Sequence, residues 1–380
     1  MSNALINGLA GAGGGIIAQI ITYPLQTVNT RQQTERIAKK KRASPDRNVL
    51  SFSPGGPSSP FGCGGTLFQI LEVIQSEGWG GLYSGLKPSL VGTAASQGIY
   101  YYFYQLLKNK AEAAALARKK KGHGDGTLGM FSWLIVAAIA GSVNVLLTNP
   151  IWVLVTRMQT HTQAEKKMLE ARKEDMLKEF SEKNSSDISD LKRKLAELDL
   201  FKPHPYGTFH AAHEIYREAG IKGFWKGLVP TLIMVCNPSI QFMIYEMSVK
   251  HLQLKRYGTK HEGKKLTALE VFLLGALAKL GATISTYPLL VVKSRLQAKQ
   301  EIGSNAMLRY TGMLSALRSH WQYFDAIKKM IRHEGLKGFY KGMGTKIVQS
   351  VFAASVLFMV KEELVKALMF LADESQKILH

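Results

Sequence analysis

Six apolar stretches, each poor in charged residues, alternate along this chain with strongly polar segments. They cover residues 5–23, 86–107, 130–148, 228–249, 268–287 and 345–360. Each approaches the roughly 20 residues that a helix needs to cross a lipid bilayer. A soluble bundle of amphipathic helices is the alternative, but it explains the first stretch poorly, because residues 5–21 carry no charge. The pattern therefore predicts an all-α membrane protein with six transmembrane helices.

Shorter segments between these stretches predict surface helices at residues 66–75, 209–217 and 324–332. Three insertions separate the predicted elements. Residues 43–65 are rich in Ser, Pro and Gly, which favours a flexible loop. Residues 162–200 alternate Lys and Glu with apolar residues, which predicts a solvent-exposed helix or helical hairpin. Residues 306–319 form an extra segment to which the sequence assigns no role.

A spaced motif follows three of the six stretches, and we call it the Pro–Arg–Gln motif. In each copy a proline is followed seven residues later by arginine and nine residues later by glutamine. The copies are Pro24, Arg31 and Gln33; Pro150, Arg157 and Gln159; and Pro288, Arg295 and Gln297. A second pattern, here called the Glu–Gly segment, occupies residues 77–85, 218–227 and 334–342. Repetition on this scale predicts three copies of a two-helix unit, in residues 1–118, 119–260 and 261–380.

Together, the Pro–Arg–Gln motif and the Glu–Gly segment resemble the signature of the mitochondrial carrier family, in all three thirds of the chain. Members of this family are six-helix membrane transporters with threefold pseudosymmetry and short surface helices between the spans of each repeat. The amino-acid sequences of the motifs that begin at Tyr23, Thr148 and Tyr287 are most similar to the peroxisomal branch, in particular to plant-type peroxisomal NAD carriers. The resemblance implies that both termini face the cytosol.

One gate is implied at the end of the spans where the Pro–Arg–Gln motifs lie. The resemblance implies that the three prolines kink the odd-numbered helices there, and that the three glutamines of the motif brace the closure. In the family, acidic and basic residues two and five positions after each proline form ion pairs. Here these positions hold Gln26 and Asn29, Trp152 and Val155, and Leu290 and Lys293. The order of the repeats would place Lys293 opposite Trp152, where a cation–π contact of ~0.5–2 kcal/mol replaces an ion pair.

The opposite gate, on the even-numbered helices, is similarly poor in charge. The family pattern implies one ion pair here, between Lys108 and Glu362. Because both gates lack most of the expected charges, the sequence predicts transport that is less strictly coupled to counter-exchange than in a carrier with complete networks.

Substrate contacts in the family lie on the even-numbered helices near the middle of the membrane. They correspond here to Gly92, the pair Ile233 and Met234, and Gln349. Two polar residues, Ser96 and Asn237, lie about one turn deeper and are candidates to bind a base or a ribose, since intramembrane polar residues usually face the interior. Asn237 precedes Pro238, so fixing the backbone at a kink is the alternative role for its side chain.

Lys279 is the most informative single residue. It lies within the fifth stretch, nine residues before Pro288, with no acidic residue within one turn of its own helix. A charged side chain at the centre of a membrane helix costs at least ~2.5–3.5 kcal/mol. The sequence therefore predicts that Lys279 faces a water-filled cavity and contacts a substrate phosphate. Snorkelling to an interface, or pairing with a carboxylate of another helix, is the alternative.

Small residues in the odd-numbered stretches predict close helix packing rather than a phosphate-binding loop. Gly11 and Gly15 form a GxxxG pattern, but no strand precedes them and no Gly-Lys-Ser/Thr follows. Comparable small residues are Ala137 and Gly141 in the third stretch and Gly275 and Gly281 in the fifth.

A net charge of +21 raises the alternative of nucleic-acid binding. The basic residues lie mainly in loops and accompany no nucleic-acid-binding fingerprint, so anionic lipids and anionic substrates are the expected partners. No enzyme or metal motif was found. His210 and His213, for example, lack the glutamate and the spacing of a zinc protease site.

The resemblance implies a monomeric, multi-pass transporter of the peroxisomal membrane with no resident cofactor, which imports NAD in exchange for AMP or a related adenine nucleotide. A mitochondrial inner-membrane location is the alternative. The same pocket would suit a carrier of ATP, ADP and AMP or of coenzyme A. A membrane scaffold built on a degenerate carrier fold, without transport activity, is the alternative from a different functional class.

Overall fold

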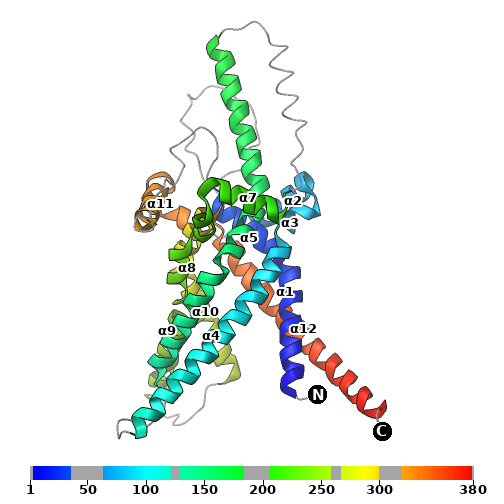
Figure 1. The fold of residues 1–380 in the computed structure, drawn as a ribbon, viewed down its shortest axis with the longest axis vertical. Helices are drawn as coiled ribbons and strands as arrows, with labels where there is room; N and C mark the ends of the chain where they lie inside the picture. The colour runs from blue at the N-terminus through cyan, green and yellow to red at the C-terminus, as the bar shows by residue number, and fades with distance from the viewer. Residues whose placement is uncertain are drawn as a thin grey trace. The chain divides into compact units, whose positions relative to one another are not determined.

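The computed structural model describes residues 3–35, 63–120, 129–183, 206–257, 267–298 and 319–378. These segments are helical almost throughout, and none of them contains a β-strand (Figure 1). The predicted all-α class is confirmed.

Each of the six predicted membrane stretches lies within helical structure. They fall in α1 (Asn3–Thr34), α4 (Leu86–Lys120), α5 (Met130–Lys183), α8 (Leu228–Met234) with α9 (Asn237–Tyr257), α10 (Ala268–Gln297) and α12 (Met343–Ile378). In the described part of the chain, three helical runs are long and apolar enough by themselves to cross a membrane: Ser132–Glu170, Ile221–Lys255 and Glu270–Gln297.

A helix also lies at each place where the sequence predicts a surface helix. These are α2 (Cys63–Glu77), α7 (Thr208–Ala219) and α11 (Ser319–Glu334). A short helix within the Glu–Gly segment follows each of them: α3 (Trp79–Leu82), η1 (Ile221–Trp225) and η3 (Leu336–Tyr340). The same succession of elements thus occurs three times.

Two helices differ from the prediction. The fourth stretch is interrupted at Val235 and Cys236, whose amides bond to carbonyls only three residues earlier. Pro238 follows within α9 and has no amide hydrogen to continue the ladder. The third helix, α5, does not end with its apolar stretch but continues as one 54-residue helix to Lys183. The first part of the 162–200 insertion is therefore helical, as predicted, and continues α5, whereas residues 184–200 lie outside the described residues.

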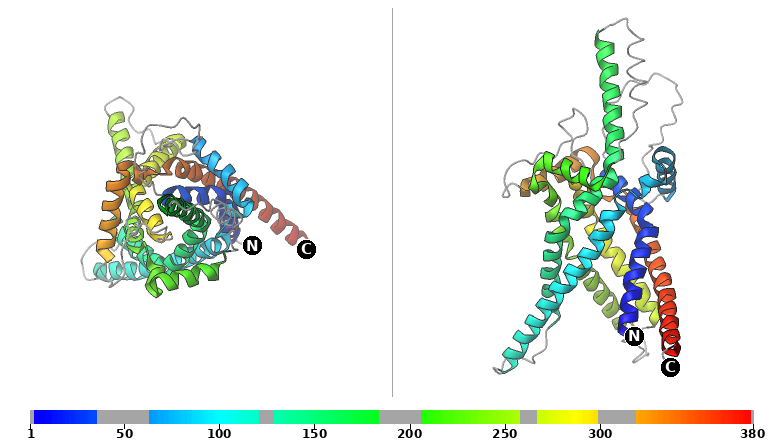
Figure 2. Two further views of the ribbon diagram at one scale, coloured as in Figure 1. Left: turned by 90° about the horizontal axis from the view of Figure 1, so that it is seen from above. Right: turned by 45° about the vertical axis from the view of Figure 1, so that its right-hand side comes forward.

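The chain divides into two compact units. The first comprises residues 1–90, 154–220 and 298–380, and the second comprises residues 91–153 and 221–297. In the first unit α1 packs along α12, as the views in Figures 1 and 2 agree. In the second unit α10 packs against α8 and α9. Because α5 is divided after Val153, its two halves belong to different units.

The predicted close packing at small residues holds at two of the glycines. A Cβ atom added to Gly141 would lie 2.7 Å from Val235 Cγ1, and one added to Gly281 would lie 2.9 Å from Ile244 Cδ1. The prediction is wrong for Gly15 and Gly275, where an added Cβ would meet no atom within 4 Å. The side-chain surroundings of position 11 lie outside the described residues.

Candidate functional site

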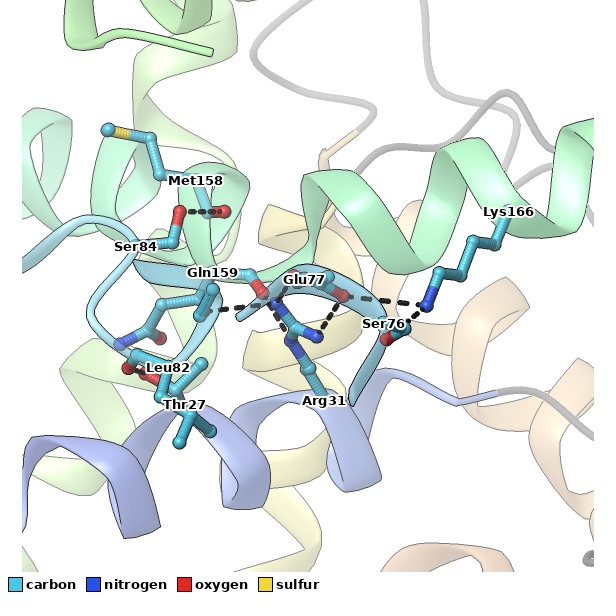
Figure 3. Close-up of polar contacts among 10 residues, drawn as sticks. Thr27, Arg31, Ser76, Glu77, Leu82, Ser84, Met158, Gln159 and Lys166 are labelled. Carbon is cyan, nitrogen blue, oxygen red and sulfur yellow. Dashed lines mark hydrogen bonds and ion pairs between the residues drawn. The ribbon is translucent and has the colours of Figure 1, made fainter. Parts of the chain in front are cut away.

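A buried ion pair joins the Pro–Arg–Gln motif of the first repeat to its Glu–Gly segment. The Arg31 guanidinium donates to both carboxylate oxygens of Glu77, at 2.7 and 2.8 Å, and each side chain is only 8% exposed (Figure 3). Arg31 also donates from Nε to the Gln159 carbonyl at 2.9 Å and from Nη2 to the Gly81 carbonyl at 3.3 Å. This one side chain therefore links α1, the Glu–Gly segment and α5.

Three hydroxyl groups strengthen the same junction. Tyr23 donates to the Ser84 carbonyl at 3.0 Å, and Thr27 donates to the Leu82 carbonyl at 2.8 Å. Ser84 in turn donates to the Met158 carbonyl of α5 at 2.9 Å (Figure 3). The backbone of the first Glu–Gly segment is thus held from α1 on one side and from α5 on the other.

The second repeat contains an equivalent pair. Arg157 donates to the two carboxylate oxygens of Glu218 at 2.6 and 2.7 Å, and the arginine side chain is fully buried. Asn149, which occupies the position before Pro150 as Tyr23 does before Pro24, donates to the Phe224 and Lys226 carbonyls at 3.0 and 3.4 Å. Tyr23 and Asn149 therefore act alike, since each fixes the backbone just before the last glycine of its Glu–Gly segment.

The last glycines of the three Glu–Gly segments share one backbone conformation. Gly85, Gly227 and Gly342 have φ angles of 80°, 74° and 79°, a region that favours glycine. An added Cβ would lie 3.2 Å from Met158 Cβ at Gly85, 3.1 Å from Gln297 Cγ at Gly227 and 3.1 Å from Gln32 Cβ at Gly342. Each repeat thus places its last glycine against the Pro–Arg–Gln helix of the next repeat, in cyclic order.

A second polar cluster lies beside the Arg157 pair. The His161 ring stacks on the Tyr206 ring with a centroid separation of 3.4 Å, and His161 Nε2 lies 3.6 Å from Glu165 Oε1. The Tyr206 hydroxyl donates to Glu214. Burial raises the pKa of the Tyr206 hydroxyl above its ordinary value, and the bond to Glu214 raises it further. Tyr206 therefore remains a neutral donor at physiological pH.

The structure places the predicted kink and brace residues in the three corresponding helices. Pro24, Pro150 and Pro288 lie inside α1, α5 and α10. Gln33 donates to Asn29 Oδ1 at 2.8 Å, and Gln297 donates to the Lys226 carbonyl at 3.4 Å. Gln159 is buried and offers its carbonyl to Arg31.

Two of the gate residues on the Pro–Arg–Gln helices, Asn29 and Trp152, make neutral hydrogen bonds. Asn29 is buried and accepts from Gln33, and Gln26 is half-buried. Trp152 donates from Nε1 to Ser96 Oγ at 3.4 Å, which brings a predicted gate residue and a predicted substrate residue together. Lys293 is half-buried in α10. Its pairing with Trp152 stays a prediction.

At the opposite gate, Lys108 lies 3.9 Å from Glu112 on its own helix and 5.3 Å from the centroid of the Trp133 ring. The Glu362 side chain lies outside the described residues. The predicted pair between Lys108 and Glu362 therefore also stays a prediction.

Lys279 is exposed on α10, and within the described residues no salt bridge joins it to a carboxylate. Asn237 donates from its amide nitrogen to Thr286 Oγ1 at 2.7 Å and to the Ala282 carbonyl at 3.4 Å. It therefore ties the start of α9 to α10. These bonds give Asn237 the backbone-fixing role that the sequence offered as an alternative to substrate binding. Only its amide oxygen is left to bind another partner.

The remaining candidates differ in environment. Gly92 lies against α5, because an added Cβ would be 3.0 Å from Ile151 Cγ2 and 3.6 Å from Trp152 Cζ2. Ile233 is 50% exposed and Met234 is half-buried. Gln349 is buried and accepts from Lys346 Nζ at 3.1 Å. No group of three or more potential metal ligands occurs among the residues that the structure describes.

The two ion pairs and the pre-proline donors were not predicted from the sequence, although both partners of each pair were visible as repeated residues. A buried arginine requires a carboxylate, and each repeat supplies a glutamate at the start of its Glu–Gly segment. The occurrence of one motif arginine and one such glutamate in every repeat was the signal that could have predicted these ion pairs.

Comparison with known proteins agrees with this architecture. The family described as "Mitochondrial carrier protein" matches residues 2–113, 188–256 and 264–371. The chain is 58% identical over 366 residues, covering 96% of both chains, to the peroxisomal nicotinamide adenine dinucleotide carrier of Arabidopsis thaliana. It is 30% identical to peroxisomal membrane protein PMP34 of Mus musculus, over 96% of this chain and 93% of that protein. It is 28% identical to the chloroplastic nicotinamide adenine dinucleotide transporter 1 of Arabidopsis thaliana, over 94% and 89% of the two chains. This chain, with its six-span fold of three two-helix repeats, belongs to the mitochondrial carrier family.

Proposed function

We propose that this protein imports NAD across the peroxisomal membrane in exchange for AMP or a related adenine nucleotide. The observation that carries the proposal is the 58% identity, across 96% of both chains, to a peroxisomal NAD carrier. The protein works as a monomer within the lipid bilayer. NAD and AMP are its cargo, and it needs no resident cofactor or metal and catalyses no chemical conversion.

Transport proceeds by alternating access, in which the three repeats move about one central site and the two gates open in turn. Lys279 supplies the positive charge for the substrate phosphates. An exposed ammonium in the middle of a membrane helix is costly unless water or an anion surrounds it. A diphosphate offers the oxygens with which lysine makes charge-assisted hydrogen bonds.

Neutral residues of the second compact unit, to which Lys279 also belongs, suit the remainder of an adenine nucleotide. The amide oxygen of Asn237 makes no hydrogen bond within the described residues and can accept from an adenine amino group or a ribose hydroxyl. Ile233 and Met234 provide apolar surface for a flat base, Ser96 provides a hydroxyl, and Gly92 stays a predicted contact on α4. Gln349 on α12 stays a predicted substrate contact.

Because both gates have few charged residues, uptake of one substrate is only loosely coupled to release of another. Asn29 and Gln26 occupy positions that carry charge in the family, and Asn29 bonds within its own helix. Closing such a gate releases less electrostatic energy, so less energy is needed to reopen it. The carrier without substrate can therefore switch more readily between its two alternating-access states. We expect measurable NAD uptake into vesicles that contain no counter-substrate. Uptake that strictly requires internal nucleotide would contradict this part of the proposal.

The proposal is tested by uptake of labelled NAD into proteoliposomes preloaded with AMP. The native chain should transport NAD, and Lys279→Ala should reduce the initial rate at low substrate by about tenfold or more, because a charge-assisted hydrogen bond is lost. Lys279→Arg should retain part of the activity. Lys250→Ala is the matched control, since Lys250 is 72% exposed and pairs with Glu246 on its own helix.

Three other outcomes have distinct meanings. Uptake of ATP or of coenzyme A without NAD would identify the alternative cargo. Equal rates for the native chain and Lys279→Ala would remove Lys279 from the site. Absence of transport of every adenine compound by a folded protein would favour the scaffold.

A further inference from the structure

The extension of α5 beyond its membrane stretch reaches the surface helix of the first repeat. Lys166, which lies within the 162–200 insertion, donates from Nζ to Ser76 Oγ at 2.7 Å. The same Nζ lies 3.8 Å from Glu77 Oε1 (Figure 3). Ser76 and Glu77 are the last two residues of α2. A residue of the insertion thus contacts the carboxylate that already binds Arg31.

We propose that Lys166 is a positioning residue for transport: it fastens α2 of the first repeat to α5 of the second repeat in one of the two alternating-access states. The inference rests on the proposed transport function. In this structure the Lys166 contact accompanies the bonds around Arg31, where the same Glu–Gly segment is held by α1 and α5.

The geometry allows Lys166 to bind without disturbing the buried pair. Glu77 Oε1 accepts from Arg31 at 2.7 Å, and an ionised carboxylate has about four acceptor sites, so a second donor can approach the same group. The Lys166 side chain is 43% exposed, whereas Glu77 is 8% exposed. The lysine therefore keeps water contact and loses little hydration when it binds or leaves.

A contact that must break in every transport cycle has to be weak. A fully buried contact between moving parts would hold the carrier in one state, whereas a contact made by a partly exposed lysine shifts an equilibrium by only about two- to fivefold. The Lys166 contact is of the second kind, whereas the buried Arg31–Glu77 pair lies within the first repeat and need not break during transport. The buried pair holds the fold of the junction, and the exposed lysine adjusts how long the junction stays closed.

The first test compares transport kinetics from the two sides of the membrane for Lys166→Ala, Lys166→Glu and Lys166→Arg. Loss of the contact should change the apparent KM in opposite directions for substrate added outside and inside, by about two- to fivefold. Lys166→Glu should act in the same direction and more strongly, because it repels Glu77, and Lys166→Arg should restore native values. Arg172→Ala is the matched control, since Arg172 is an exposed basic residue on the same extension.

The second test does not require transport. A double-mutant cycle with Ser76→Ala and Lys166→Ala is measured by thermal unfolding of the purified protein in detergent, and non-additive shifts in Tm are expected. Additive shifts would overturn the contact. Non-additive shifts together with unchanged KM values on both sides would make the contact structural only and would overturn the positioning role.

The experiments distinguish failure of the proposed transport function from failure of the positioning role of Lys166. If the Tm shifts are coupled but NAD is not carried, the cargo assignment has failed, and the kinetic comparison is made with whichever adenine compound is taken up. If no compound is transported at all, both the transport function and the positioning role are overturned.

Discussion

The first two repeats carry the same Arg–Glu pair in different surroundings. Arg31 binds Glu77 and, in addition, the carbonyls of Gln159 and Gly81. Arg157 binds Glu218, but its Nε is buried and has no hydrogen-bond partner in the described part of the chain. The guanidinium of the first repeat thus donates to three groups, whereas in the described part of the chain that of the second donates to its carboxylate alone.

This difference shows that repeats with one motif need not share one energetic role. The satisfied Arg31 joins two repeats, because Gln159 belongs to α5. Arg157 serves its own repeat and gives no backbone link to another within the described residues. The repeated sequence pattern therefore determines which residues form an ion pair, while the groups around each pair determine how much it contributes to stability.

Removing the carboxylate in each repeat should give the largest and most unequal effects. We expect Glu218→Gln to lower the free energy of unfolding by about 3–5 kcal/mol, because it removes the carboxylate that pairs directly with a fully buried guanidinium. Glu77→Gln should cost less, about 1–3 kcal/mol, since Arg31 keeps two backbone acceptors. Thermal unfolding of both variants in the same detergent measures the difference. Equal losses would show that the extra bonds of Arg31 contribute nothing.

Alanine substitutions of one glycine in α1 and one in α5 should have intermediate effects on stability. Gly141→Ala should lower stability by about 1–3 kcal/mol, since the new methyl group would overlap the stiff, β-branched Val235 at 2.7 Å. Gly15→Ala, at the equivalent place in the first repeat, meets no atom within 4 Å and should raise stability by up to about 1 kcal/mol through helix propensity. Unfolding temperatures of the two variants decide this, and destabilisation by Gly15→Ala would contradict the open surroundings of that residue.

Much of the fold could be predicted from the sequence, because the length of an apolar stretch and its lack of charge nearly determine a membrane helix. The continuation of α5 was missed for a physical reason. No Gly or Pro stands between Gln159 and Lys183, so nothing ends the helix where the apolar stretch ends. The break before Asn237 was signalled by Pro238, yet its position depends on the bonds from Asn237 to α10.

The candidate site was less predictable, because its contacts join residues far apart in the chain. The Pro–Arg–Gln motif named Arg31 but not the carbonyl of Gln159, which is 128 residues away. Lys166 could not be singled out among the many lysines of its insertion, since only the direction of α5 brings it to Ser76. The gate assignments for Lys293, Lys108 and Glu362, and the substrate assignments, remain predictions to be tested by transport.

The smallest expected effect concerns the residues before the prolines. Tyr23→Phe removes one hydrogen bond, of 3.0 Å to the Ser84 carbonyl, and keeps the ring that stacks on Tyr83. We expect a loss of about 0.5–1.5 kcal/mol, measured by thermal unfolding. Tyr83→Phe is the matched control, because it removes the same group where no hydrogen bond is made within the described residues. Asn149→Ala should cost more than Tyr23→Phe, since it removes two hydrogen bonds, to the Phe224 and Lys226 carbonyls, instead of one. If Tyr23→Phe and Tyr83→Phe are equally stable, the first Glu–Gly segment is held by Arg31, Thr27 and Ser84 without Tyr23. The likeness between Tyr23 and Asn149 is then one of position without a shared energetic role.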